Sequence, residues 1–187
     1  MVYFKDPSIM DSVIYHANYI IRPGSVDLGI KSLSGSREAN SLVLASALKI
    51  MGTQGYALLI EHGIETARLF AEEIEKRPDF ELITPPVLSI LTYRICPSHI
   101  KQELSKGSID KKISLNEKLN DINRTVQRLQ REAGKSFVSR TTLKAENIDI
   151  VVLRCVIMNP MTDIKILCEI LDEQEEIYRL NFRGTGG

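Results

Sequence analysis

An arginine stands inside an otherwise apolar run near the C-terminal end of the sequence. The run extends from Ile150 to Pro160, is rich in β-branched residues and has Arg154 as its single charge. Such a composition predicts a buried β-strand. A guanidinium keeps its proton in proteins, and an unpaired charge among apolar neighbours costs several kcal/mol. We therefore expect Arg154 to meet a carboxylate at the edge of the core, which can belong to this chain or to a ligand.

Other motifs that carry chemistry are missing from the sequence. It has no glycine-rich dinucleotide loop, no Walker loop, no paired Cys-x-x-Cys, no His-Glu-x-x-His and no nucleophile elbow. Its three histidines are too scattered to predict a catalytic set. Cys96, Cys155 and Cys168 lie in apolar surroundings without metal-ligand spacing. We therefore predict no metal site, and we interpret the cysteines as small buried side chains in a reducing compartment.

Length and composition predict a soluble protein of one domain, or of a small domain with an appendage. Of the 187 residues 43% are hydrophobic, and 24 basic residues balance 24 acidic ones. Because no long run of either charge is present, we expect neither nucleic acid nor an acidic membrane as a partner. The apolar run 42–51 is much shorter than the about 20 residues of a membrane span. No signal peptide is recognisable, which favours the cytoplasm.

The first part of the sequence predicts a short strand, a loop and two helices. Residues 1–4 are predicted as a strand, and Asp6-Pro7 as the cap and first turn of a helix. A glycine-rich loop at 22–36 precedes an almost wholly apolar helix from Glu38, which ends at Gly52. A long amphipathic linker helix follows. Because the N-terminal strand has no neighbour here, we expect a further segment upstream.

A second unit is predicted from residue 78 onward. The order strand, strand, helix, strand, strand, helix is typical of a small antiparallel sheet with helices over one face. The predicted elements are two strands on either side of Pro85-Pro86, a loose stretch at 101–113, a helix with a capping box at Ser114–Glu117 that ends near Gly134, strands around 136–143 and 150–158, and a helix capped by Thr162.

Several short motifs follow one another along the chain. They are His16-Ala-Asn-Tyr19, Asp27-Leu-Gly29, Gly35-Ser-Arg37, Gly52-Thr-Gln-Gly-Tyr56, Leu153-Arg154 and Asn159-Pro-Met-Thr162. In order and spacing this series resembles the C-terminal part of the group II pyridoxal-phosphate-dependent amino-acid decarboxylases. Asp79–Leu82, Leu91–Arg94 and Gly134–Arg140 are similar to the bacterial aspartate or glutamate decarboxylase-like branch of that family. The resemblance covers nearly the whole chain.

The resemblance implies an α/β fold, namely the C-terminal part of an aminotransferase-like fold that binds pyridoxal 5'-phosphate. Residues 1–77 would be the end of the large cofactor-binding domain with its linker helix. Residues 78–182 would be the small α+β domain, and residues 183–187 a disordered tail. The family is dimeric, with active sites at the subunit interface, so a homodimer is expected.

The resemblance further implies a lyase that decarboxylates a small acidic amino acid such as aspartate or glutamate. The lysine that binds the cofactor lies upstream of Met1 in the family, so no catalytic residue is expected in this chain, which would be inert alone. Within this chain, Lys31 and Lys135 are the nearest candidates for a lysine that binds the cofactor. The alternative function is non-catalytic: a truncated remnant, or an interaction module that keeps the small sheet.

Two positions match substrate-binding residues of the family. Arg154 stands where glutamate-type members place the arginine that holds a substrate carboxylate. Arg37, with Gly35 and Ser36, matches the edge of the active site, which faces the neighbouring subunit in some members. Ser36 replaces a glycine of the family at this edge. The loop at 22–34 corresponds to the mobile catalytic loop, but it lacks the tyrosine that animal members use as proton donor.

Overall fold

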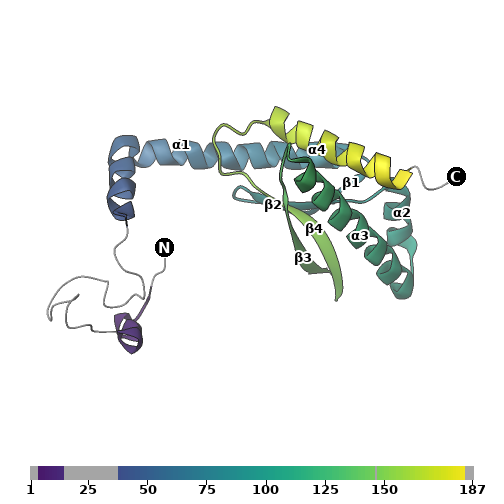
Figure 1. Ribbon diagram of the computed structural model, residues 1–187, viewed down its shortest axis with the longest axis horizontal. Helices are drawn as coiled ribbons and strands as arrows, with labels where there is room; N and C mark the ends of the chain where they lie inside the picture. The colour runs from purple at the N-terminus through teal and green to yellow at the C-terminus, as the bar shows by residue number, and fades with distance from the viewer. Residues whose placement is uncertain (1–3, 15–37, 146, 184–187) are drawn as a thin grey trace. The chain divides into compact units, whose positions relative to one another are not determined.

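The computed structural model describes residues 4–14, 38–145 and 147–183 of the chain (Figure 1). The chain divides into two compact units, Met1–Thr53 and Gln54–Gly187. In the first unit, Asp6 caps the 3-10 helix η1 (Pro7–Val13) by accepting a hydrogen bond from the Ser8 N–H at 2.9 Å. The predicted cap is therefore confirmed. The strand predicted at 1–4 lies outside the described residues, apart from Phe4.

Helix α1 (Asn40–Lys76) is interrupted at Gly52, which has a φ of 63° and a ψ of 179°. A positive φ is easily adopted by glycine, and the predicted break at this residue is confirmed. By length and composition alone α1 could cross a membrane, a test that core helices also pass. The second half of α1 buries Ala67, Phe70 and Ile74 in the core of the second unit, although the sequence analysis had assigned this half to a linker helix.

The sheet has four antiparallel strands in the order β1-β2-β4-β3. They are β1 (Phe80–Val87), β2 (Ile90–Ile95), β3 (Ser139–Ala145) and β4 (Ile148–Val156). The first hairpin turns after Val87, where Leu88 has a φ of 53°, so the turn predicted at Pro85-Pro86 is wrong. The two prolines lie where the register between β1 and β2 shifts. An edge strand tolerates proline at such an irregularity because no ladder hydrogen bond is lost there.

Two helices follow the first hairpin, and a third follows the second hairpin. They are α2 (Ser98–Lys106), α3 (Ile109–Ala133) and α4 (Ile164–Tyr178), which continues into the short π-helix η3 (Arg179–Arg183). The loose stretch predicted at 101–113 is thus largely helical. Gly134 ends α3 in the left-handed conformation, as predicted, with a φ of 70°. Asp163 rather than Thr162 caps α4, because its carboxylate accepts the Ile166 N–H at 2.9 Å.

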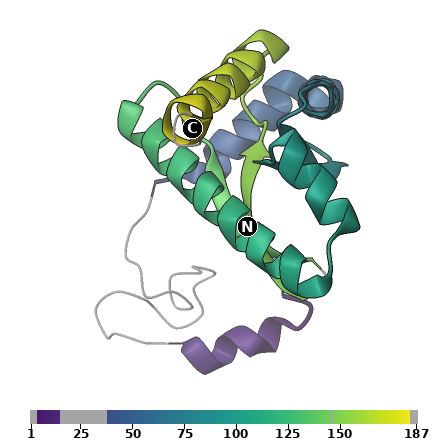
Figure 2. The same cartoon turned by 90° about the vertical axis from the view of Figure 1, so that its right-hand side faces the viewer.

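The core of the second unit lies between the sheet and the helices α1, α3 and α4. Figures 1 and 2 show α3 and α4 side by side over the sheet. Phe70 of α1 meets Tyr93 of β2 edge to face, with ring centroids 5.6 Å apart. Leu119 of α3 and Leu171 of α4 are fully buried in the same cluster. The predicted class, a small antiparallel sheet covered by helices, is confirmed.

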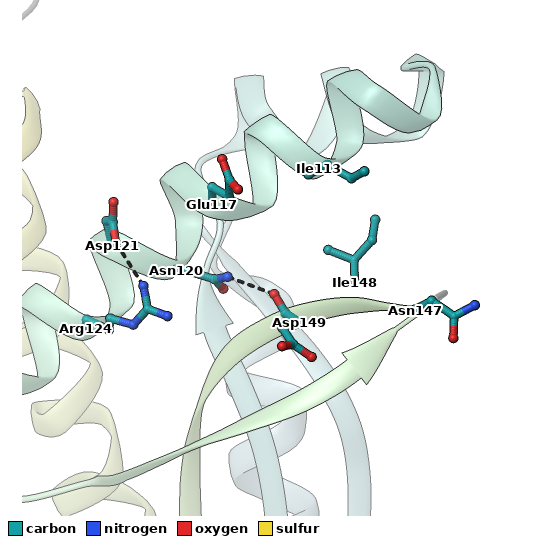
Figure 3. A pocket seen from close by; sticks show the side chains of 8 residues that line it. All are labelled: Ile113, Glu117, Asn120, Asp121, Arg124, Asn147, Ile148 and Asp149. Atoms are coloured by element: carbon teal, nitrogen blue, oxygen red, sulfur yellow. Dashed lines mark hydrogen bonds and ion pairs between the residues drawn. The ribbon is translucent and has the colours of Figure 1, made fainter.

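Helix α3 begins at Ile109, so the capping box predicted at Ser114–Glu117 lies inside the helix and is wrong. The helix also carries buried amides, which the sequence analysis missed. The pairing of β2 with β4 ends at Tyr93 and Leu153. Beyond that point Asn123 bonds the main chain of Ile95, accepting its N–H at 2.8 Å and donating to its carbonyl at 2.9 Å. Asn120 does the same for β4. It accepts the Val151 N–H at 2.6 Å and donates to the Asp149 carbonyl at 2.8 Å, the bond drawn in Figure 3. The amides replace hydrogen bonds between strands that have separated.

Candidate functional site

Arg154 lies in an inner strand, β4, yet it is exposed. The four residues before it, Ile150 to Leu153, are buried, as the sequence predicted for this strand. The register places Thr92 of β2 opposite Arg154 on one side and Ser139 of β3 on the other. Residues that face each other across antiparallel strands share a face of the sheet. The Arg154 side chain therefore stands between two hydroxyl side chains.

The guanidinium of Arg154 forms neither an ion pair nor a hydrogen bond with the part of the chain that the structure describes. Ser139 Oγ donates to the main-chain carbonyl of Arg154 at 2.9 Å, which leaves the side chain free. None of the described acidic residues of this chain pairs with Arg154. A ligand carboxylate as its partner stays a prediction.

The arginine that meets an acid of the chain is Arg94 in β2. Its side chain is only 6% exposed, and its Nε donates to Glu81 Oε2 at 2.6 Å. The Nη1 atom donates to Asn116 Oδ1 of α3 at 2.7 Å. Glu81 lies directly opposite Arg94 in β1. The sequence analysis did not single out this pair, and counting register outward from the hairpin turn would have missed it, because the register between β1 and β2 shifts twice on the way.

A cavity of about 380 Å³ opens beside Arg154, between the start of β3, the end of β4 and helix α4. Its polar lining residues are Ser139, Arg154, Asn159 and Thr162, and the remainder are apolar, among them Phe137, Met158 and Ile166. Neither a carboxylate nor a lysine is found among its described lining residues. This cavity suits a ligand that has an anionic group and a short apolar arm, because Arg154 is the one charged side chain among its described lining residues.

A larger cavity of about 580 Å³ lies between α3 and the β3–β4 hairpin (Figure 3). Glu117, Asp121 and Asp149 line it together with Arg124, which pairs with Asp121 at 3.0 Å. The Asn120 amide at its wall is already used by the Asp149 carbonyl. This cavity lacks an unpaired cation among the described residues, so Arg154 marks the better candidate for an anionic ligand.

Several predicted site residues lie outside the described residues, namely Gly35, Ser36 and Arg37 at the expected edge of the active site, and Lys31. Lys135 is described and exposed. It lines a separate cavity beside α4 with Glu169, Glu173 and other residues, rather than the cavity at Arg154. Among the described residues, no cluster of three or more histidines, cysteines and acids could hold a metal ion.

The thiol of Cys155, which also lines the Arg154 cavity, is held in its protonated form. Burial raises the pKa of this thiol to about 11. Burial, and to a lesser extent the carboxylate of Glu81, raises the pKa of the Cys96 thiol to about 12. A nucleophilic cysteine requires a lowered pKa. Both residues are therefore packing residues, as the sequence predicted.

The raised pKa of Cys155 predicts a loss of stability in alkali. The thiol has an ordinary pKa of 9.0 in the unfolded chain and about 11 in the folded chain. Its contribution to folding is therefore complete below pH 9 and is lost as the pH rises through 11. We expect the free energy of unfolding in urea to fall between pH 9 and 11, and to fall less steeply in Cys155→Ala. Equal slopes for both proteins would contradict the assignment.

The pyridoxal-dependent decarboxylase conserved domain matches residues 1–96, which is just over half of the chain. The chain belongs to this family, as the resemblance of its motifs predicted. It is 46% identical over 180 residues to an aspartate 1-decarboxylase of Aliivibrio fischeri, an alignment that covers 95% of this chain and 33% of that relative. The chain therefore spans about a third of the length of this curated relative.

Solved structures share the fold at low sequence identity. A crystal structure of mouse CSAD in apo form superposes with a TM-score of 0.69 at 19% identity, over 92% of this chain and 34% of that one. A crystal structure of Oryza sativa TDC with PLP and tryptamine gives a TM-score of 0.61 at 15% identity, over 82% of this chain and 29% of that one. The aminotransferase-like family fold expected from the sequence is thereby confirmed.

Pyridoxal phosphate is the cofactor of this family, but the cavity at Arg154 does not fit it as a resident group. The cofactor needs a lysine for its Schiff base and an acid at its pyridine nitrogen. The described lining residues include neither of them. The described lining residues of this cavity therefore do not by themselves form a site for the cofactor.

Proposed function

We propose that this chain is the C-terminal portion of a pyridoxal-phosphate-dependent decarboxylase of a small acidic amino acid, aspartate or glutamate. The observation that carries the proposal is the exposed guanidinium of Arg154, unpaired among the described residues, beside a cavity with no described carboxylate. The 46% identity to the aspartate 1-decarboxylase of Aliivibrio fischeri supports the same substrate class. Arg154 would hold a carboxylate of the substrate.

The chemistry of decarboxylation indicates which carboxylate that is. An acidic amino acid loses its α-carboxylate as carbon dioxide and keeps the distal one. If Arg154 paired with the leaving group, it would stabilise the charged ground state more than the transition state, in which that charge flows away, and would slow the reaction. On the distal carboxylate, Arg154 orients the substrate without this penalty. We therefore assign Arg154 to the carboxylate that the product retains.

The remaining parts of the proposal concern the rest of the site and the chain as a whole. Arg37, with Gly35 and Ser36, would lie at the edge of the active site. Residues 1–77 would belong to the large cofactor-binding domain and residues 78–182 to the small domain of a cytoplasmic enzyme. The 187-residue chain by itself is expected to be inactive, because no described lysine lines the Arg154 cavity.

A hybrid enzyme tests this function. In it, the chain replaces the matching third of the Aliivibrio fischeri aspartate 1-decarboxylase, whose unaltered form is the control. We expect release of carbon dioxide from aspartate or glutamate with a kcat/KM far above that for aromatic amino acids. The 187-residue chain with pyridoxal phosphate alone should release none. A folded hybrid that binds the cofactor but prefers an aromatic amino acid would contradict the proposal.

We also propose that the chain forms a homodimer through the region before Pro78. Each part of helix α1 exposes large apolar side chains: Val43 (67% exposed) and Ile50 (85% exposed) in the first unit, and Leu58 (67% exposed) in the second. Contiguous apolar surface above roughly 400 Å² is rare on soluble monomers, and two-fold closure is the commonest way to bury such a patch.

Sedimentation of the chain without detergent measures this association. We expect a dimer at micromolar concentration that the double variant Val43→Glu, Leu58→Glu weakens. Lys118→Glu, a charge change at an exposed position of α3, should leave the dimer intact and serves as the control. A clean monomer of the unaltered chain across micromolar concentrations would contradict the proposed dimer.

A further inference from the structure

One row of residues crosses all four strands of the sheet at Arg154. Thr84 faces Thr92 between β1 and β2, Thr92 faces Arg154 between β2 and β4, and Ser139 of β3 faces Arg154 from the other side. The hydroxyls of Thr84 and Thr92 bond each other, and Ser139 Oγ bonds the Arg154 main-chain carbonyl. The two neighbours of Arg154 in this row, and Thr84 beyond them, are uncharged, and the hydrogen bonds of these hydroxyls do not involve the Arg154 guanidinium.

A second row of the same sheet contains an acid. Glu81 faces Arg94 between β1 and β2, and the two side chains form an ion pair at 2.6 Å. The Arg94 side chain is only 6% exposed. Arg154, which faces hydroxyl residues instead, is exposed and has no partner among the described residues. Within one sheet, therefore, the arginine that faces an acid is paired, and the arginine that faces two hydroxyl residues is unpaired among the described residues.

We propose that the hydroxyl residues Thr92 and Ser139 are specificity determinants, because they keep the Arg154 guanidinium available for a carboxylate ligand. The proposal rests on the proposed function, since the ligand is taken to be the distal carboxylate of the substrate. Ser139 is the decisive position because it lines the cavity and is only half-buried, so a longer side chain can be accommodated. A carboxylate at position 139 would pair with Arg154 and compete with the ligand.

Arginine modification in the 187-residue chain tests this proposal without catalysis. Phenylglyoxal labels each arginine, and mass spectrometry of peptides gives the rate at each position. We expect Arg154 to react much faster than Arg94, and glutarate to protect Arg154. Arg128 is the internal reference, because it is exposed and lies on α3, paired with Glu132. The probe glutarate carries the carboxylate and the methylene arm that the cavity suits.

The variants Ser139→Glu and Ser139→Gln form a matched pair of equal size. In Ser139→Glu, labelling of Arg154 and its affinity for glutarate should each fall about fivefold, the upper range for a facing ion pair. Ser139→Gln should behave like the unaltered chain. If Ser139→Glu does not fold, Ser139→Asp and Ser139→Asn replace the pair. Equal behaviour of the acidic and the amide variant, or an Arg154 as unreactive as Arg94, would overturn the proposal.

The hybrid decarboxylase separates this proposal from the proposed function. If Arg154→Met leaves KM unchanged while the labelling results are as expected, the assignment of Arg154 to the substrate carboxylate falls and the role of the hydroxyl residues in keeping Arg154 unpaired stands. If Arg154→Met raises KM but Ser139→Glu and Ser139→Gln have the same KM, the hydroxyl residues are not specificity determinants and the function stands.

Discussion

Replacing Asn123 by leucine is expected to lower the free energy of unfolding by about 3–5 kcal/mol. Asn123 is fully buried, and leucine is close to it in size. Its amide satisfies both the N–H and the carbonyl of Ile95, and it also donates to the Leu119 carbonyl at 2.9 Å. Leucine would leave the two main-chain groups of Ile95 buried without partners, and each such group costs about 1–3 kcal/mol.

Urea unfolding followed by circular dichroism measures this loss. Lys118→Leu on the exposed face of the same helix is the control, and it should change the free energy of unfolding by less than about 0.5 kcal/mol. Asn123→Gln should restore little, because the longer side chain displaces the amide from Ile95 in a packed interior. If Asn123→Leu unfolds like the control, the hydrogen bonds from Asn123 to Ile95 do not hold β2 against α3.

Arg154→Met in the hybrid decarboxylase is expected to raise KM for the acidic substrate roughly ten- to hundredfold. A charge-assisted pair between arginine and a carboxylate contributes about 1.5–3 kcal/mol, which corresponds to that factor. Because the distal carboxylate does not react, kcat should change less than KM. The fold should persist, since the Arg154 guanidinium has no partner among the described residues.

Two further substitutions make this kinetic result specific. Arg154→Lys should recover only part of the affinity, because an ammonium group cannot form the two-pronged contact of a guanidinium. Arg140→Met is the matched control, because Arg140 is an exposed arginine of the neighbouring strand β3 that faces Leu153 rather than Arg154. A hybrid in which Arg154→Met binds aspartate or glutamate normally would return Arg154 to a structural role.

Local sequence patterns predicted the elements whose formation depends on neighbours in the chain. Gly52 and Gly134 end helical stretches because glycine adopts a positive φ without strain, and both breaks are confirmed. The β-branched run around Val151 predicted β4. The patterns failed at Pro85-Pro86, where an edge position tolerates the prolines. They also failed at 101–113, which is largely helical. There α3 begins at Ile109, before the predicted capping box, and tertiary contacts such as that between Asn116 and Arg94 hold this helix.

The sequence by itself determined the family, through motifs spread along the chain, and it singled out Arg154 as the charge of an apolar strand. Only the tertiary structure decided which arginine is paired. Arg94 faces Glu81 and is buried, whereas Arg154 faces Thr92 and Ser139 and is exposed. The physical reason is that hydrophobic periodicity reports only the neighbours of a residue along its own strand. The partner of a charge depends on the register between strands that are far apart in the sequence.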